Sequence, residues 1–187
     1  MSQNTKKIKH ICEKELLLIA EKVRFLVLDV DGVLTDGGII LDAGKNELKT
    51  FHVRDGHGIK MLLRAGIGVA LITGRHSKVV ERRSRELGID EVFQKCRDKT
   101  KAYQQLIDRH SLSDSEIAYV GDDIVDISVL KRCGFPVAVA DAADEVKLFA
   151  RMITKKDGGR GAVREVCDFI LSAKGLLKGI IDGYSET

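Results

Sequence analysis

The sequence predicts an α/β domain built on a doubly wound, mainly parallel sheet. Short apolar runs alternate with stretches of helical periodicity along most of the chain, which is the pattern of parallel strands joined by crossover helices. Three of the apolar runs end in polar residues, and parallel sheets bind ligands at the carboxyl ends of their strands. With 187 residues, 44% of them hydrophobic, the chain is long enough for one domain with a proper core.

The elements follow from hydrophobic periodicity and from glycines that stop helices at Gly66 and Gly88. Strands are expected over 24–29, 68–73, 91–94, 117–120, 135–139 and 152–154. Helices are expected over 8–22, 55–65, 76–87, 99–110, 123–132, 142–150 and 161–173. A protruding β-hairpin is expected over 38–53, with its turn at 42–46. The predicted organisation is an N-terminal helical extension at 1–22, the α/β domain at 23–173 and a tail at 174–187. Residues 175–187 carry no strong pattern, and disorder is one interpretation of them.

The composition excludes several classes of function. A net charge of +3 without basic clusters argues against nucleic-acid binding. No apolar stretch approaches the ~20 residues of a membrane span, and we recognise no secretory signal. The four cysteines form no C-x-x-C pair, which favours thiols in a reducing compartment. We therefore expect a cytoplasmic protein with no membrane or nucleic-acid partner.

Asp29 and Asp31 lie at the end of the first main strand and in the turn that follows it. Val30 separates them and points elsewhere, so two carboxylates can lie near one reacting centre. One can attack while the other transfers protons. The alternative is a helix-capping Asp beside a turn Asp next to Gly32.

A second acidic group follows the strand at 117–120. The run Gly121-Asp-Asp-Ile-Val-Asp126 offers three carboxylates, and oxygen clusters suit hard cations such as Mg²⁺. Asp122 is the best candidate ligand. The alternative is a helix N-terminus at which the dipole favours acids, and this interpretation fits one of the three.

Two further positions carry weaker signals. Thr73 ends a strand before Gly74, and its hydroxyl with the following N–H groups can hold phosphoryl oxygens. Lys99 opens a helix, where the dipole disfavours a cation, so it has a mild reason to be functional. Taken alone, Thr73 with Gly74 is more often without a binding role, and Lys99 is more often a solvated surface lysine.

Together these motifs resemble the haloacid dehalogenase superfamily of phosphohydrolases, whose four motifs they match in order. The resemblance implies an enzyme with a Rossmann-like fold in which Asp29 is the nucleophile and Asp31 the general acid, then base. It implies that Thr73 and Lys99 hold the phosphoryl group. It also implies Mg²⁺ bound by Asp29, the backbone carbonyl of Asp31, and Asp122, with Asp123 and Asp126 in supporting positions.

The gaps between the motifs leave no room for a cap domain. The hairpin, one helix and one strand fill the segment between Asp31 and Thr73, and a helix and a short strand fill the segment up to Lys99. An uncapped site is open to water unless a neighbouring subunit closes it. We therefore expect a homo-oligomer.

Several longer stretches resemble the capless family of 3-deoxy-D-manno-octulosonate 8-phosphate (KDO 8-phosphate) phosphatases. They are Leu34–Gly37, Phe51–Gly58, Ile72–Arg75, Ala138–Asp141 and Gly158–Glu165. The resemblance implies a homotetramer in which hairpins pack together and each tail reaches a neighbour's site. It also implies substrate contacts by Asp31, His52, Val53, Arg54, Asp55, Gly56, Lys60, Thr73, Gly74, Arg75, Arg83, Lys99 and Arg160. Arg side chains suit the carboxylate of a sugar acid phosphate. Arg83 also fits a solvated helix face, and Arg160 either clamps an anion or caps a helix start.

Three alternatives remain open from the sequence. A related capless phosphatase could act on a nine-carbon sugar acid phosphate. A phospho-acceptor signalling domain would combine similar residues but keep its acceptor on a later strand than its acid pair. A non-catalytic tetramerising module is disfavoured because all four motifs are intact.

Overall fold

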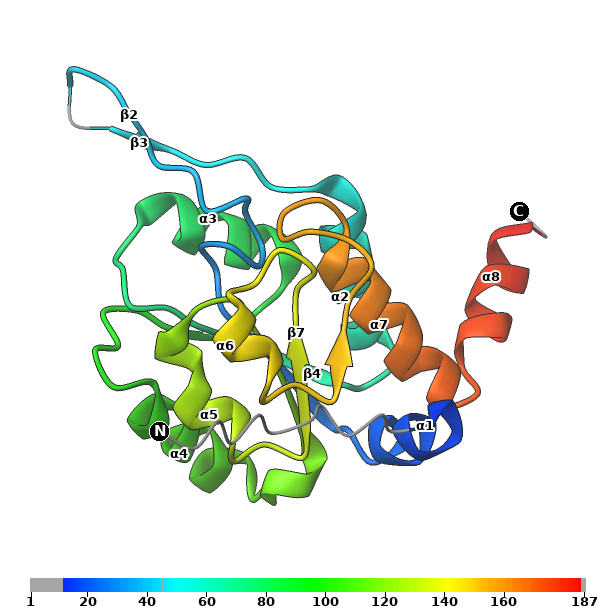
Figure 1. The fold of residues 1–187 in the computed structure, drawn as a ribbon. Helices are drawn as coiled ribbons and strands as arrows, with labels where there is room; N and C mark the ends of the chain where they lie inside the picture. Colours follow the sequence, from blue (N-terminus) through cyan, green and yellow to red (C-terminus); the bar gives the residue numbers. More distant parts are fainter. Residues whose placement is uncertain (1–11, 45, 186–187) are drawn as a thin grey trace, which may run out of the picture.

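The computed structural model describes residues 12–44 and 46–185, and its centre is a six-stranded parallel sheet (Figure 1). The strand order is β5-β4-β1-β6-β7-β8. The strands are β1 (Phe25–Leu28), β4 (Gly68–Ile72), β5 (Glu91–Phe93), β6 (Ile117–Gly121), β7 (Phe135–Ala138) and β8 (Met152–Ile153). Every residue of β1 is buried, because helices cover both faces of the sheet. The fold class predicted from the sequence is confirmed.

Helices cover the two faces in the way that right-handed crossovers require. On one face α2 (Val53–Arg64) and α1 (Glu13–Glu21) both pack against α7 (Ala162–Ala173). On the other face α4 (Lys99–His110) packs against α5 (Ile127–Leu130). The chain winds in opposite directions from β1, so its neighbours β4 and β6 flank a crevice at their carboxyl ends. The sheet order therefore places the ends of three strands at one site.

The hairpin projects from the body, as Figure 1 shows. Its strands, β2 (Ile40–Leu41) and β3 (Glu47–Leu48), pair antiparallel and are much shorter than expected. They leave Ile39, Ile40, Leu41 and Leu48 more than half exposed. A helix, α3 (Lys78–Leu87), follows β4, and the described residues between the motifs form no cap domain.

Three helical predictions differ from the structure in detail. The segment 123–132 begins with a 3₁₀ turn at Ile124–Asp126 before the short α5, and α6 spans only Asp144–Lys147. The turn forms because the Asp123 and Asp126 side chains each accept hydrogen bonds from local backbone N–H groups. Helix α1 begins at Glu13, and the part of the predicted helix at 8–11 lies outside the described residues.

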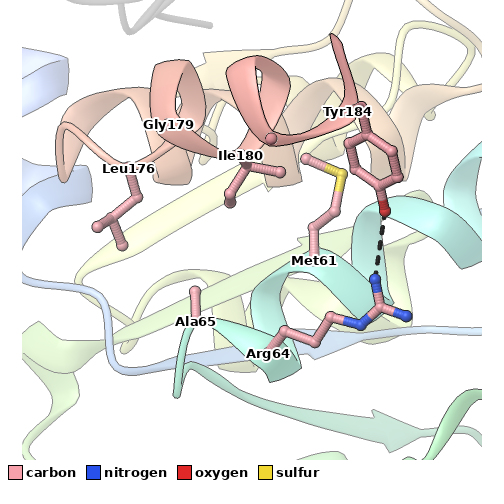
Figure 2. Close-up of a pocket in the computed structure, with 8 residues that line it drawn as sticks. Met61, Arg64, Ala65, Leu176, Gly179, Ile180 and Tyr184 are labelled. Carbon is pink, nitrogen blue, oxygen red and sulfur yellow. Dashed lines mark hydrogen bonds between the residues drawn. The ribbon is translucent and has the colours of Figure 1, made fainter. Parts of the chain in front are cut away.

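The C-terminal tail contains a helix, α8 (Leu177–Ser185), which corrects the interpretation of 175–187 as patternless. Figure 2 shows Ile180 of this helix facing α2, where Met61 lies opposite it. The Tyr184 hydroxyl accepts a hydrogen bond of 3.2 Å from Arg64 Nη1. Two glycines hid this helix from sequence reasoning, and the packing of Leu177 and Ile180 against the core offsets their low propensity. Across the described residues, no helix combines the length and apolar character needed to cross a bilayer.

Candidate active site

The ends of three adjacent strands bring the predicted motifs together. Asp29 follows β1, Thr73 follows β4 and Asp122 follows β6, and β1 lies between the other two strands. The register aligns Leu28 with both Leu71 and Val120, so the residues just beyond these positions converge. These side chains line a cavity of about 400 Å³ together with Asp31, Gly74, Arg75, Lys99 and other residues.

A buried network holds Lys99 against the nucleophile position. Lys99 Nζ lies 3.0 Å from Asp29 Oδ2 and donates a hydrogen bond of 2.6 Å to Asp126 Oδ1. The Tyr119 hydroxyl donates to the same Asp126 oxygen at 2.6 Å. The other oxygen, Asp126 Oδ2, accepts the backbone N–H groups of Asp122 and Asp123 at 3.1 and 3.3 Å. Asp126 is therefore a fully bonded support that orients the lysine.

The charges of this network are unbalanced. Burial raises the pKa of Asp29 to about 6, although Lys99 lowers it. The pKa of Asp122 is raised to about 8, mainly by burial and then by the negative charges of Asp29 and Asp126. Burial disfavours the charged form of Lys99, yet Asp29 and Asp126 together hold the pKa of Lys99 above its usual value. One lysine does not neutralise three close carboxylates, so the site attracts a further cation.

The residues present fit a divalent metal. Carboxylate oxygens of Asp29, Asp122 and Asp126 lie within 4.8 Å of one another. Asp122 Oδ1 is buried without a hydrogen-bond partner, whereas both oxygens of Asp126 are engaged. Asp29 and Asp122 are therefore the side chains available as ligands. Gly32 permits their approach, since a Cβ there would lie 2.0 Å from Asp122 Oδ2.

The opposite wall of the cavity suits an anion. Thr73 is buried at the end of β4, and its hydroxyl accepts a 3.3 Å hydrogen bond from the Arg75 N–H. Asp98 caps α4 by accepting from Thr100 N, which fixes the first turn from which Lys99 reaches inward. The side chains of Arg75 and Arg97 also border the cavity. This wall can hold phosphoryl oxygens beside the Asp29 carboxylate.

Sequence reasoning missed two residues of the hairpin that reach this site. The Lys49 ammonium contacts Asp31 Oδ1 and lies 3.3 Å from Glu47 Oε1. Arg75 joins the same group, with Nη2 at 2.9 Å from Glu47 and Nε at 3.6 Å from Asp31. The hairpin strand expected from the sequence would put Glu47 and Lys49 on one face, and that was the available signal. In the structure Lys49 directly follows β3.

Five of the other residues predicted to bind substrate line two separate cavities. His52, Arg54 and Arg160 line one of about 470 Å³, and Val53 and Arg83 line another of about 320 Å³. Neither cavity includes a residue of the catalytic one. One chain alone therefore does not bring these residues to Asp29 in the part of the molecule that the structure describes.

Three more predicted residues lie on α2. Asp55 is buried, and its carboxylate accepts the Arg164 N–H at 2.7 Å, which ties the start of α2 to the start of α7. Gly56 is buried, and a Cβ there would lie 2.4 Å from Arg83 Nη2. Lys60 is half-buried. All three residues lie where α2 packs against its neighbouring helices, and none of them lines the catalytic cavity.

Arg160 does not cap a helix in this structure. Its Nη2 lies 3.3 Å from Asp36 Oδ2, and the side chain is largely exposed. Helix α7 begins after Gly161, which adopts φ of +110° at the N-cap. The interpretation that Arg160 clamps an anion stays a prediction, and in this structure the guanidinium is paired with Asp36.

The groove between α8 and α2 is larger than the catalytic cavity but has a different character. It measures about 700 Å³ and is lined mainly by apolar residues such as Met61, Leu176 and Ile180 (Figure 2). None of its lining residues is a carboxylate or nucleophile. The smaller cavity at the strand ends is therefore the candidate active site.

An aspartate pair directly after the central strand, a paired lysine and a second acidic loop define a phosphohydrolase of the haloacid dehalogenase type. The sequence model of the family described as haloacid dehalogenase-like hydrolase matches residues 88–166. The 3-deoxy-D-manno-octulosonate 8-phosphate phosphatase of Escherichia coli K12 is 46% identical over 163 residues, 87% of each chain. The chain belongs to the family of 3-deoxy-D-manno-octulosonate 8-phosphate phosphatases.

Solved structures agree with this assignment. The phosphatase of that name from Yersinia pestis matches with a TM-score of 0.87 at 44% identity, covering 88% of this chain and 89% of that one. The one from Moraxella catarrhalis, in complex with a magnesium ion, a phosphate ion and a KDO molecule, matches with a TM-score of 0.91 at 38% identity. It covers 92% of this chain and 99% of that chain. The resemblance stated from the motifs is confirmed, and the protein is a phosphatase.

Proposed function

We propose that the protein hydrolyses KDO 8-phosphate to KDO and inorganic phosphate, with Mg²⁺ as its cofactor. The observation that carries the proposal is the Asp29 carboxylate, held 3.0 Å from Lys99 and beside Asp122 in a cavity at the strand ends. The similarity to phosphatases of that substrate supports the choice of sugar. Membership of this family argues against the signalling-domain and non-catalytic alternatives.

The first step transfers the phosphoryl group to Asp29. A phosphate monoester is an anion, so the attacking carboxylate repels it. Lys99 offsets this repulsion from one side, and Thr73 with the N–H groups after it holds the phosphoryl oxygens in line. Mg²⁺, held by Asp29, the Asp31 carbonyl and Asp122, would supply further positive charge and orient the phosphoryl group.

Asp31 acts as general acid in the first step and as general base in the second. It protonates the leaving alkoxide as the phosphorus–oxygen bond breaks and Asp29 becomes a phospho-aspartate. It then takes a proton from water, which attacks phosphorus and releases phosphate and the Asp29 carboxylate. Positioning supplies about 7–11 kcal/mol and proton transfer about 10²–10⁴-fold. Phosphatase-scale acceleration of up to ~10²¹ therefore also needs the charges of Lys99 and the metal.

The substrate is tested with a panel of sugar phosphates. We expect kcat/KM for KDO 8-phosphate to exceed that for a nine-carbon sugar acid phosphate and for neutral sugar phosphates by about 10²-fold or more, since Arg side chains would bind the carboxylate. Initial-rate assays of released phosphate measure this. A higher kcat/KM for the nine-carbon acid phosphate would identify that compound as the substrate instead of KDO 8-phosphate. Comparable rates on neutral sugar phosphates would contradict recognition of a sugar acid.

A homotetramer explains why the predicted substrate residues are divided. In one chain His52–Gly56, Lys60, Arg83 and Arg160 lie apart from the catalytic cavity. The hairpin carries four exposed apolar side chains, of which Leu41 is 65% exposed. Packing of hairpins would bury these side chains, and neighbouring chains, including a neighbour's tail, would then complete each site.

Leu41→Asp tests this assembly. We expect it to convert the tetramer to smaller species, because a charge would be buried among the packed hairpins. Light scattering after gel filtration measures the mass. The exposed residue Leu18 on α1 supplies the matched control, Leu18→Asp, which should remain tetrameric. A wild-type protein that is monomeric at working concentration would contradict the proposal.

Magnesium binding is expected to strengthen with pH. The pKa of Asp122 is raised to about 8 and that of Asp29 to about 6, so at pH 6 the metal must displace protons. The magnesium Kd should fall by about tenfold per pH unit between pH 6 and 7, and binding should release protons. Titration calorimetry in buffers of different ionisation enthalpy measures both. A pH-independent Kd would contradict this, and Asp122→Asn should abolish the binding.

The cytoplasmic location also stays a proposal. All four cysteines, namely Cys12, Cys96, Cys133 and Cys167, are free thiols in the structure. Unpaired thiols are typical of reducing compartments. This supports the location inferred from the sequence.

A further inference from the structure

The hairpin is exposed except where it meets the catalytic cavity. Leu48 is 56% exposed, but the side chain of the next residue, Lys49, is only 1% exposed. A lysine is almost never fully buried unless it is paired. Lys49 is paired with Asp31 and with Glu47, the latter at 3.3 Å.

Four charged groups form a closed cluster at this point. Arg75 Nη2 lies 2.9 Å from Glu47 Oε1, and Arg75 Nε lies 3.6 Å from Asp31 Oδ2. Each of the two carboxylates therefore contacts both cations. The cluster has two positive and two negative groups, so the buried lysine leaves no unpaired charge.

The geometry points to Lys49 as the positioning residue of Asp31, which it orients for proton transfer to the leaving group. This inference rests on the proposed acid–base role of Asp31. Lys49 contacts Oδ1, while the more exposed Arg75 lies near Oδ2 at a longer distance. Glu47 in turn holds the Lys49 ammonium in place. A general acid must lie within hydrogen-bond reach of the atom it protonates, so a carboxylate free to rotate would lose much of its effect.

Through Lys49, the hairpin thus contributes to catalysis in its own chain. The exposed apolar side chains of the hairpin are available to other chains, whereas Glu47 and Lys49 face inward to the site. Glu47 lies in β3 and Lys49 directly follows it, so one short element serves both purposes.

The test compares leaving groups. The sugar alkoxide of KDO 8-phosphate is a strong base that needs a proton to leave, whereas 4-nitrophenolate leaves without one. The parameter kcat/KM reports the steps up to release of the leaving group, so the later attack of water does not enter. For Lys49→Met we expect kcat/KM to fall about 10²-fold with KDO 8-phosphate and less than about threefold with 4-nitrophenyl phosphate.

Two reference variants make the result decisive. Asp31→Asn should show the same selective loss to a larger degree, and Lys101→Met, at an exposed position of α4, should show neither loss. Retained activity on 4-nitrophenyl phosphate shows that Lys49→Met is folded with a working nucleophile. If Asp31→Asn shows the selective loss but Lys49→Met loses kcat/KM equally on both substrates, or on neither, the inference about Lys49 is overturned. If Asp31→Asn shows no selectivity, the proposed acid role itself fails.

Discussion

Asp29→Asn is expected to lower kcat/KM by about 10⁴-fold or more, because an amide cannot attack phosphorus to form an acyl phosphate. Asn has nearly the same shape as Asp, so the contact with Lys99 and the packing at the end of β1 are retained. Steady-state release of phosphate measures the loss. Incubation with substrate, followed by acid quench, should detect a phosphorylated protein in the wild type only.

The stability of this variant provides an independent check. The pKa of Asp29 is raised from 3.8 to about 6, so the folded chain binds the proton more tightly than the unfolded chain does. The contribution of Asp29 to stability therefore falls as pH rises through this interval, and above it the charged group is disfavoured. In metal-free buffer at pH 8, Asp29→Asn should be at least as stable as the wild type.

The matched control is Asp90→Asn, at an exposed position before β5. It should keep wild-type activity and stability. Activity of Asp29→Asn within tenfold of the wild type would exclude Asp29 as nucleophile. Loss of folded structure in that variant would contradict the view that its carboxylate serves chemistry and not stability.

Lys99→Met is expected to lose both activity and stability. Among the residues that the structure describes, Lys99 is the only cation paired with both Asp29 and Asp126. The methionine removes this charge, so kcat should fall by about 10²–10³-fold. The variant also leaves buried carboxylates unpaired, which costs about 3–5 kcal/mol of the free energy of unfolding at pH 8. Urea denaturation in metal-free buffer measures this cost.

The loss of stability should depend on pH in a defined direction. Asp29 and Asp122 have pKa values raised to about 6 and about 8, so both take up protons in the folded state as pH falls to 5. Less negative charge then remains for Lys99 to offset. The difference in the free energy of unfolding between Lys99→Met and the wild type should therefore be smaller at pH 5 than at pH 8. Lys101→Met, at an exposed position two residues further along α4, should be neutral at both pH values. An equal loss at pH 5 and pH 8 would show that Lys99 contributes through packing alone.

Sequence reasoning succeeded for the residues at the strand ends. Asp29, Thr73 and Asp122 each follow an apolar run, and the topology of a doubly wound sheet brings such positions to one edge. Lys99 was placed by the resemblance of its motif, and the structure supplies the physical reason for its burial in two carboxylate contacts. These residues were predictable because sheet topology follows from the order of strands and helices.

The same reasoning could not find partners that depend on side-chain packing. Tyr119 reads as one more apolar residue of β6, yet its hydroxyl donates to Asp126. Lys49 reads as a solvated hairpin residue, yet its side chain is buried against Asp31. Helix α8 contains glycines that weaken its pattern, and its hydrogen bond to α2 joins Arg64 to Tyr184, far apart in the chain. None of these features has a local signal of sufficient strength.

Three features could be predicted from the sequence alone: the fold class, the position of Asp29 and Asp31 directly after the central strand, and the absence of room for a cap domain. These features follow from periodicity and from the spacing of motifs along the chain. The interactions of the carboxylates became evident only from the tertiary structure. Both oxygens of Asp126 accept hydrogen bonds, one oxygen of Asp122 has no hydrogen-bond partner, and Lys49 forms an ion pair with Asp31. The physical reason is that burial and charge pairing are set by contacts between elements far apart in sequence.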